Sequence, residues 1–147
     1  MAIKYQLPFF LEGTVSQQEY AKWLTRKANT HLKRDRNRGN VTATRLAYKE
    51  AIHIAVHGSK GSDAYTGEML DWSLLSIYDN DDSKRLGREY KKSLALLPTI
   101  DHVGDGLGPA DFKICGWRTN DAKNDLSYQE FLSVCKAVVV HEEAQDK

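Results

Sequence analysis

The residues best placed to do chemistry are the adjacent pair Asp101 and His102 and, further along the chain, Asn120. The pair follows an apolar run at 97–100. A glycine-rich loop then leads to a second apolar run at 112–117, which precedes Asn120. Carboxylate and amide oxygens suit a hard divalent cation such as Mg²⁺, and a neutral histidine can take a proton from water near pH 7. These are the groups that a metal-dependent phosphodiesterase needs.

The same stretch resembles a known nuclease motif. Its first part reads Asp101-His102-Val103, and Asp111 stands where the motif has the first asparagine of its second part. The residues that match the rest of the second part in order and spacing are Phe112, Ile114, Cys115, Asn120 and Lys123. Positions 65 to about 132 therefore resemble the HNH, or ββα-metal (His-Me finger), endonuclease family. Tyr65-Thr66-Gly67-Glu68 is similar to the turn that opens many such domains.

The resemblance implies an α+β fold with a ββα-metal core preceded by N-terminal helices. We expect positions 1–147 to form a single domain, with a basic helical part at 1–60 and the nuclease-like core at 63–140. Many members hold a structural zinc in two Cys-x-x-Cys pairs. Cys115 and Cys135 lack that spacing, so we expect no structural zinc and two reduced core cysteines in a cytoplasmic protein. The aromatic residues expected to brace the core instead are Trp72, Tyr78, Phe112 and Trp117.

The resemblance also implies a role for four of these residues. Asp101 and Asn120 would bind the catalytic cation, Mg²⁺ or Mn²⁺, and His102 would be the general base that activates water. Asp111 would orient the imidazole of His102 through its other ring nitrogen, or would join the metal ligands. Because neighbouring strand residues point to opposite faces, Asp101 and His102 can serve one site only where the strand ends and bends. The glycines within 104–108 permit such a bend.

Three further polar residues near Asn120 could serve the same reaction. Lys123 can contact a phosphate, and Arg118 can contact the phosphate in the transition state. Asn124 lies four residues after Asn120 and so on the same helix face, where it could support the metal ligands through hydrogen bonds or serve as an additional ligand. Each pattern has an ordinary alternative. An asparagine ahead of a helix is commonly its N-cap, Arg118 can simply pair with a nearby aspartate, and an isolated Asp-His pair is commonly a surface turn.

Charge is unevenly distributed, although the formal net charge is only +1. Positions 22–49 hold nine lysines and arginines and a single acid, Asp35, whereas positions 63–82 hold six acids and no lysine or arginine. A basic stripe is the electrostatic footprint of a protein that holds a phosphate backbone. The residues expected to contact DNA are Lys27, Lys33, Arg34, Arg36 and Arg38. The alternative is a solvated helix face, and the acidic residues at 79–82 indicate a solvated turn.

Apolar periodicity and capping residues predict the supporting elements. An amphipathic helix is expected at 17–36, where Ser16 and Glu19 form a capping box, and a second helix at 44–57. Strands are expected at 95–103 and 112–117. The remaining expected elements are a charged helix at 83–93 with Leu86 and Tyr90 inward, and a helix from about 120 that breaks at a second capping box, Ser127 to Glu130, and continues through 138.

Together these patterns predict a Mg²⁺- or Mn²⁺-dependent endonuclease that hydrolyses phosphodiester bonds in DNA, most simply double-stranded DNA, by a one-metal mechanism. A homodimer is possible, because one such site cuts one strand. No apolar run approaches the roughly 20 residues that cross a bilayer, so no membrane partner is expected. Two alternatives stay open: a nucleic-acid-binding module that has lost cleavage, and a phosphodiesterase acting on RNA or nucleotides.

Overall fold

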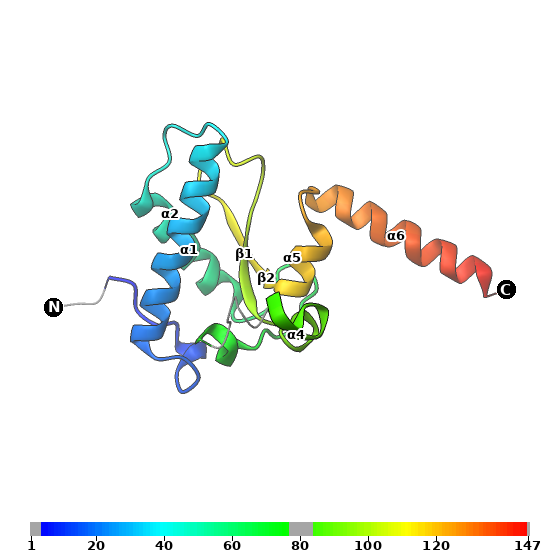
Figure 1. Cartoon of the computed structure of the whole chain (residues 1–147), viewed down its shortest axis with the longest axis horizontal. Helices are drawn as coiled ribbons and strands as arrows, with labels where there is room; N and C mark the ends of the chain where they lie inside the picture. The colour runs from blue at the N-terminus through cyan, green and yellow to red at the C-terminus, as the bar shows by residue number, and fades with distance from the viewer. Residues whose placement is uncertain (1–3, 77–83, 147) are drawn as a thin grey trace.

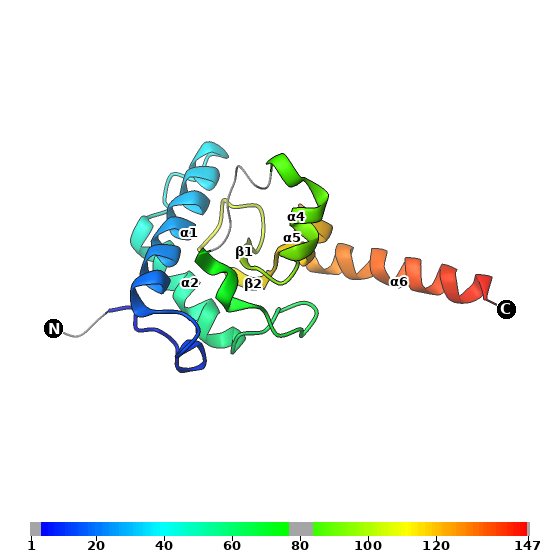
Figure 2. The same cartoon turned by 60° about the horizontal axis from the view of Figure 1, so that its bottom comes forward.

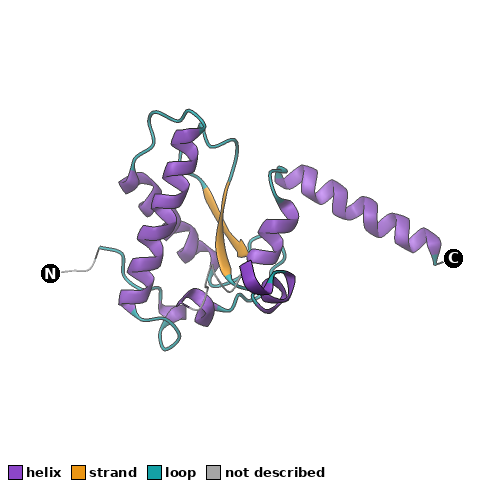
Figure 3. Cartoon of the chain, viewed as in Figure 1, coloured by secondary structure: helices purple, strands orange, loops and turns teal. Residues whose placement is uncertain are grey.

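The computed structural model describes residues 4–76 and 84–146. The chain is a mixed α+β protein whose strands form an antiparallel pair, as expected from the sequence (Figures 1 and 3). The elements in chain order are η1 (Phe9–Leu11), α1 (Gln17–Asn37), α2 (Arg45–Ser59), η2 (Trp72–Ser76), α4 (Arg88–Ser93), β1 (Pro98–His102), β2 (Phe112–Gly116), α5 (Trp117–Lys123) and α6 (Tyr128–Gln145).

The N-terminal helices form where their capping residues predict. Ser16 and Glu19 make the expected capping box at α1, and the Thr44 side chain accepts a hydrogen bond from the backbone N–H of Ala47 at the start of α2. The two helices pack against each other, and α2 packs on β2. They lie on one side of the hairpin while α5 lies on the other (Figures 1 and 2). The buried residues that form one core across α1, α2, η2 and the hairpin include Tyr20, Trp23, Leu24, Tyr48, Ile52, Trp72, Ile100, Phe112 and Ile114.

The hairpin brings the two halves of the predicted motif side by side. Pro98 pairs with Gly116, and the register runs to His102 opposite Phe112. Pro98 opens β1, which agrees with its missing backbone donor. The strand is shorter than the predicted 95–103 because Leu94 and Leu97 lie in turns that close on the end of α4. The next helix, α5, begins at Trp117. The sequence predicted that this helix begins near Asn120, whereas Asn120 lies inside it.

The last helix, α6, begins at the predicted capping box, in which Ser127 and Glu130 satisfy each other's backbone N–H groups. It extends away from the rest of the protein (Figures 1 and 2) and contains no buried residue. Cys135 on this helix is therefore exposed, and only Cys115 occupies the core that was expected for both. The helix is capped like α1 but lacks the packing that buries α1.

The predictions about individual side chains are confirmed in part. Tyr90 on α4 is buried as predicted, but Leu86 is 45% exposed. Trp72 and Phe112 are core residues and Trp117 is half-buried, while Tyr78 and the acidic stretch 79–82 lie outside the described residues. Among the helices that the structure describes, none has the length and apolar character needed to cross a membrane.

Candidate functional site

A cavity of about 950 Å³ opens beside the C-terminal end of β1. Its lining comes from that end, from the C-terminal end of α1 and from the junction between α5 and α6. Figure 1 shows the C-terminal end of α1 and the α5–α6 junction toward its upper side. The predicted residues that line it together are Asp101, His102, Asn120, Lys123, Asn124, Arg34 and Arg38. The site therefore combines the hairpin motif with two arginines of the basic stretch.

His102 is held by a buried carboxylate from the N-terminal half of the chain. Its Nδ1 lies 2.5 Å from Oδ2 of Asp35, and the side chain of Asp35 is fully buried. The hydroxyl of Tyr48 on α2 donates to the same Oδ2 at 2.6 Å. Burial and this hydrogen bond raise the pKa of Tyr48, so its hydroxyl stays protonated. Within residues 4–76 and 84–146, Nε2 of His102 has no protein hydrogen-bond partner.

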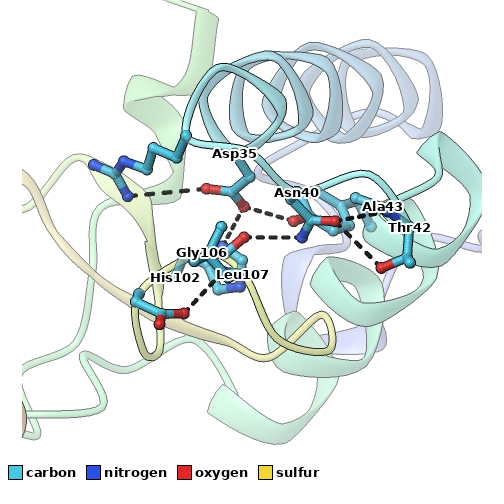
Figure 4. Close-up of polar contacts among 10 residues, drawn as sticks. Asp35, Asn40, Thr42, Ala43, His102, Gly106 and Leu107 are labelled. Carbon is cyan, nitrogen blue, oxygen red and sulfur yellow. Dashed lines mark hydrogen bonds and ion pairs between the residues drawn. The ribbon is translucent and has the colours of Figure 1, made fainter.

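Asp35 lies near the C-terminal end of α1, where Arg38 Nη1 is 3.9 Å from its Oδ1, and next to the loop that follows β1 (Figure 4). The side-chain amide of Asn40 donates to the carbonyl of Gly106 at 2.8 Å, which ties that loop to the end of α1. Gly106 has a φ of +84°, and a Cβ there would lie 2.5 Å from Oδ1 of Asp35. The loop can thus close over the carboxylate only with glycine at this position.

The structure places Asp111 outside the cavity that contains His102, the residue it was predicted to orient. Phe112 is the residue opposite His102 in the hairpin, and its ring packs on the imidazole with centroids 4.5 Å apart. Successive strand residues point to opposite faces, so Asp111 is turned away from the imidazole. It is exposed and lines a second cavity of about 490 Å³ beside α2.

Asp101 meets a different set of partners on the α5 side of β1. Lys123 Nζ lies 2.9 Å from Oδ2 of Asp101, and the hydroxyl of Tyr65 donates to the same oxygen at 2.5 Å. Both contacts are to Oδ2, and the structure's described residues give Oδ1 no protein partner. Tyr65 is placed by Asp63, whose Oδ1 accepts from the backbone N–H of Tyr65 and whose Oδ2 accepts from that of Gly116. One Asp101 oxygen therefore remains for a ligand.

Two of the predicted phosphate contacts are already paired. Lys123 is a buried ion-pair partner of Asp101, because α5 starts earlier than expected and turns its last residue toward β1. Arg118 forms an ion pair with Glu68, not with a neighbouring aspartate, and does not line the cavity. Asp121 instead pairs with Lys91. Lys123 and Arg118 would therefore have to leave these partners to meet a phosphate.

The basic stretch also divides, because helical periodicity spreads it around α1. Arg34 and Arg38 reach the cavity, and Lys33 is exposed elsewhere on the helix. Arg36 donates to the carbonyl of Ala43. Lys27 is half-buried, and burial together with Arg26 and Arg34 lowers its pKa to about 8. The expected five-residue DNA contact therefore reduces to two arginines at the cavity.

His31 lies on the same face of α1, one turn before Asp35. It is buried, and its ring packs edge-on against Phe112 with centroids 5.4 Å apart. Burial, with Arg34, Lys27 and His102 nearby, lowers its pKa to about 3, although Asp35 opposes this shift. His31 is therefore neutral at physiological pH and adds no charge beside His102.

Sequence reasoning missed Asp35 and Tyr48, and it read Tyr65 only as part of a turn. One signal for Asp35 was present. It is the single acid in the basic stretch, and it falls on the apolar stripe of the helix predicted at 17–36, three to four residues beyond Leu32 and His31. A charged residue on a buried helix face requires a partner, but nothing local identifies that partner as His102.

The donor set determines which cation could bind. The described residues contain no group of three or more His, Cys, Asp and Glu side chains that could hold a metal. Asp101 and Asn120 line the same cavity. A carboxylate and an amide make the sparse oxygen set that Mg²⁺ accepts when it keeps several waters. Comparisons of the chain with protein-family models, curated proteins and solved structures gave no match.

Proposed function

We propose that the protein is a divalent-metal-dependent endonuclease that hydrolyses phosphodiester bonds in DNA, with β1, β2 and α5 as a ββα-metal core. One observation carries the proposal. A histidine anchored at one ring nitrogen by a fully buried carboxylate lies in the same cavity as Asp101, Asn120 and two arginines. The resemblance of the sequence pattern to the HNH family supports the same reading.

The first function of the site is to hold His102 as a base. A carboxylate can only accept hydrogen bonds, so with Asp35 beside Nδ1 the proton of neutral His102 belongs on that nitrogen. Nε2 then carries the lone pair that can take a proton from a water. Tyr48 holds Asp35 in place by donating to it. General-base catalysis of this kind contributes about 10²–10⁴-fold.

The second function is to position the phosphodiester. Asp101 Oδ1 and the Asn120 amide oxygen would hold Mg²⁺ or Mn²⁺. When bound, the cation would stabilise negative charge on the phosphate and on the leaving 3′ oxygen. Arg34 and Arg38 on the α1 wall would attract the phosphate backbone. Arg38 is 54% exposed and lies 3.9 Å from Oδ1 of Asp35, so it would meet a phosphate while balancing that carboxylate. Lys123 compensates the charge of Asp101, so the site would bind the metal less tightly than one built from free carboxylates.

A nicking assay tests the proposal. Supercoiled plasmid is incubated with wild type in Mg²⁺, in Mn²⁺ and in EDTA, and with His102→Ala and Asp35→Asn in each metal. We expect metal-dependent nicking by wild type, a loss of about 10²-fold or more in His102→Ala, and an intermediate loss in Asp35→Asn. His141→Ala, which changes an exposed histidine on α6, is the matched control and should nick like wild type. Undiminished nicking by His102→Ala would falsify the assignment of the base.

The ion pair between Lys123 and Asp101 favours one alternative, a nucleic-acid-binding module that has lost cleavage. In that case the cation of Lys123 permanently occupies the place of a metal. Binding of labelled DNA by wild type in EDTA, with no nicking in either metal, would identify this function. Parallel reactions with RNA and with a small phosphodiester separate the proposed DNA nuclease from a phosphodiesterase of broader substrate range.

A further inference from the structure

An aromatic pair at the mouth of the cavity has no part in the chemistry above. The rings of Tyr65 and Tyr128 are stacked, with centroids 5.6 Å apart and an interplanar angle of 22°. Both residues line the cavity, and Tyr128 is 46% exposed although it is a large aromatic residue. It is the first residue of α6, directly after the Ser127 cap.

Tyr65 gives this pair a rigid base. Its hydroxyl is bonded to Asp101 at 2.5 Å, and Lys123 Nζ lies 5.6 Å from the centroid of its ring. Tyr65 stacks on one side of the Tyr128 ring, and Tyr128 remains 46% exposed. An exposed aromatic ring supported in this way is the kind of platform on which unpaired nucleobases stack.

Charge around the cavity separates a place for phosphate from a place for a base. The α1 side presents Arg34 and Arg38, whereas the α5–α6 side presents Asp125 and also Glu130, whose Oε1 accepts from the backbone N–H of Ser127. The other charged residues of that side, Lys123 and Asp121, are in ion pairs with Asp101 and Lys91. Phosphate is repelled from the acidic side and attracted to the arginine side. A neutral base with exocyclic amino groups suits the acidic side, because carboxylates accept hydrogen bonds from such groups.

We propose that the exposed ring of Tyr128 is a stacking subsite for a nucleobase that has left the duplex stack, next to the phosphate held at Asp101 and His102. This inference deepens the proposed function and rests on it for the position of the phosphate. With such a subsite, the substrate is DNA that is single-stranded, or locally unpaired, at the site of cleavage. An uninterrupted paired duplex would have no base to place on Tyr128.

Fluorescence of 2-aminopurine, which falls when the base stacks on an aromatic ring, tests the subsite in EDTA without cleavage. Single-stranded oligonucleotides carry the probe at successive positions, and the same sequences are also presented as full duplexes. With wild type we expect quenching beyond that of the free strand at one or a few positions, and tighter binding of the single strand than of the duplex. Tyr128→Leu should abolish that quenching and weaken single-strand binding roughly tenfold, whereas Tyr128→Phe should retain both.

Phe9→Leu, at an aromatic residue that is 78% exposed elsewhere, is the matched control and should behave as wild type. Circular dichroism establishes that Tyr128→Leu keeps its helices. The subsite is overturned if Tyr128→Leu quenches and binds as wild type does, if no position is quenched, or if duplex binds as tightly as single strand. Quenching that depends on Tyr128, with no nicking of any DNA in metal, retains the subsite and removes the nuclease. Nicking without quenching retains the nuclease and removes the subsite.

Discussion

Two neighbouring residues of β1, His102 and Asp101, have opposite surroundings although they line one cavity. His102 meets a carboxylate and a tyrosine from α1 and α2, Asp35 and Tyr48. Asp101 meets an ammonium and a tyrosine from the α5 side, Lys123 and Tyr65. Each strand residue thus has one charged partner and one hydroxyl, but the signs of the charges are reversed.

The partners of the two strand residues differ in their access to water. The Asp35 side chain is fully buried, whereas the Lys123 side chain is 7% exposed. Asp101 itself is 10% exposed, and its Oδ1 has no partner among the residues that the structure describes. A fully enclosed polar group depends on its partners, because removing one leaves the others unsatisfied. A group at a cavity wall can turn to water. We therefore infer that the α1 side holds the site in shape and that the α5 side receives ligands.

Removal of Asp35 should have the largest effect. Asp35→Ala leaves the Tyr48 hydroxyl and His102 Nδ1 without their acceptor in the protein interior. We expect the free energy of unfolding to fall by about 3–5 kcal/mol, measured by urea denaturation with tryptophan fluorescence. Asp35→Asn keeps the shape and an acceptor oxygen, so it should lose less. Equal losses in the two variants would show that volume, and not the acceptor, is what the site requires.

Gly106→Ala tests how closely the Asp35 carboxylate is enclosed, because Gly106 lies in the loop next to this carboxylate. The new Cβ would lie 2.5 Å from Oδ1 of Asp35 in a left-handed backbone conformation, and we expect a loss of about 3 kcal/mol. Gly104→Ala is the matched control, since Gly104 also has a positive φ but a Cβ there would meet no atom within 4 Å. It should lose only about 1 kcal/mol. The difference between the two, read from urea midpoints at equal m-values, measures the contact with Asp35.

Lys123→Met tests the more open surroundings. Asp101 loses its counter-ion but keeps Tyr65 and access to the cavity. We expect a loss of about 2 kcal/mol, smaller than that for Asp35→Ala. Isothermal titration with Mn²⁺ provides the second measurement, in which the variant should bind the cation more tightly because Asp101 is no longer neutralised. A stability loss as large as that of Asp35→Ala would remove the distinction between the two sides.

Features that depend on residues close together in the sequence could be predicted, whereas contacts between distant segments could not. The elements came from local signals, namely the capping boxes at Ser16 and Ser127 and the two apolar runs of the hairpin. One continuous sequence motif predicted that Asp101, His102 and Asn120 lie together. The pairing of Asp35 with His102 depends on how α1 packs beside the hairpin, which no local pattern specifies. For the same reason the capping box predicted α6 as a helix, but not that it would lie unpacked.

The two tyrosines offer a finer comparison, because Phe removes only the hydroxyl. Tyr48 is 1% exposed and donates to a fully buried carboxylate, so Tyr48→Phe should lose about 2 kcal/mol. Tyr65 is half-buried at the cavity wall, so Tyr65→Phe should lose about 1 kcal/mol. Urea denaturation of the two variants and of the double variant provides the test. A larger loss for Tyr65→Phe would reverse the assignment of the enclosed side.

The smallest expected effect is a pH dependence to which the enclosed side contributes through His31. His31 has a pKa of about 3 in the folded protein because it is buried among Arg34, Lys27 and His102, against about 6.5 when unfolded. The unfolded chain therefore binds one more proton between these values, and stability is complete above pH 6.5 and falls as the pH drops toward 3. At pH 6 the loss should be about 0.8 kcal/mol. His31→Leu should reduce the slope of urea midpoints measured between pH 7.5 and 5, while His141→Ala, at an exposed histidine, should leave it unchanged. The slope that remains belongs in part to His53, whose pKa is also lowered by burial and by His57. An undiminished slope in His31→Leu would assign the whole pH dependence to other groups and would separate His31 from the enclosure around Asp35.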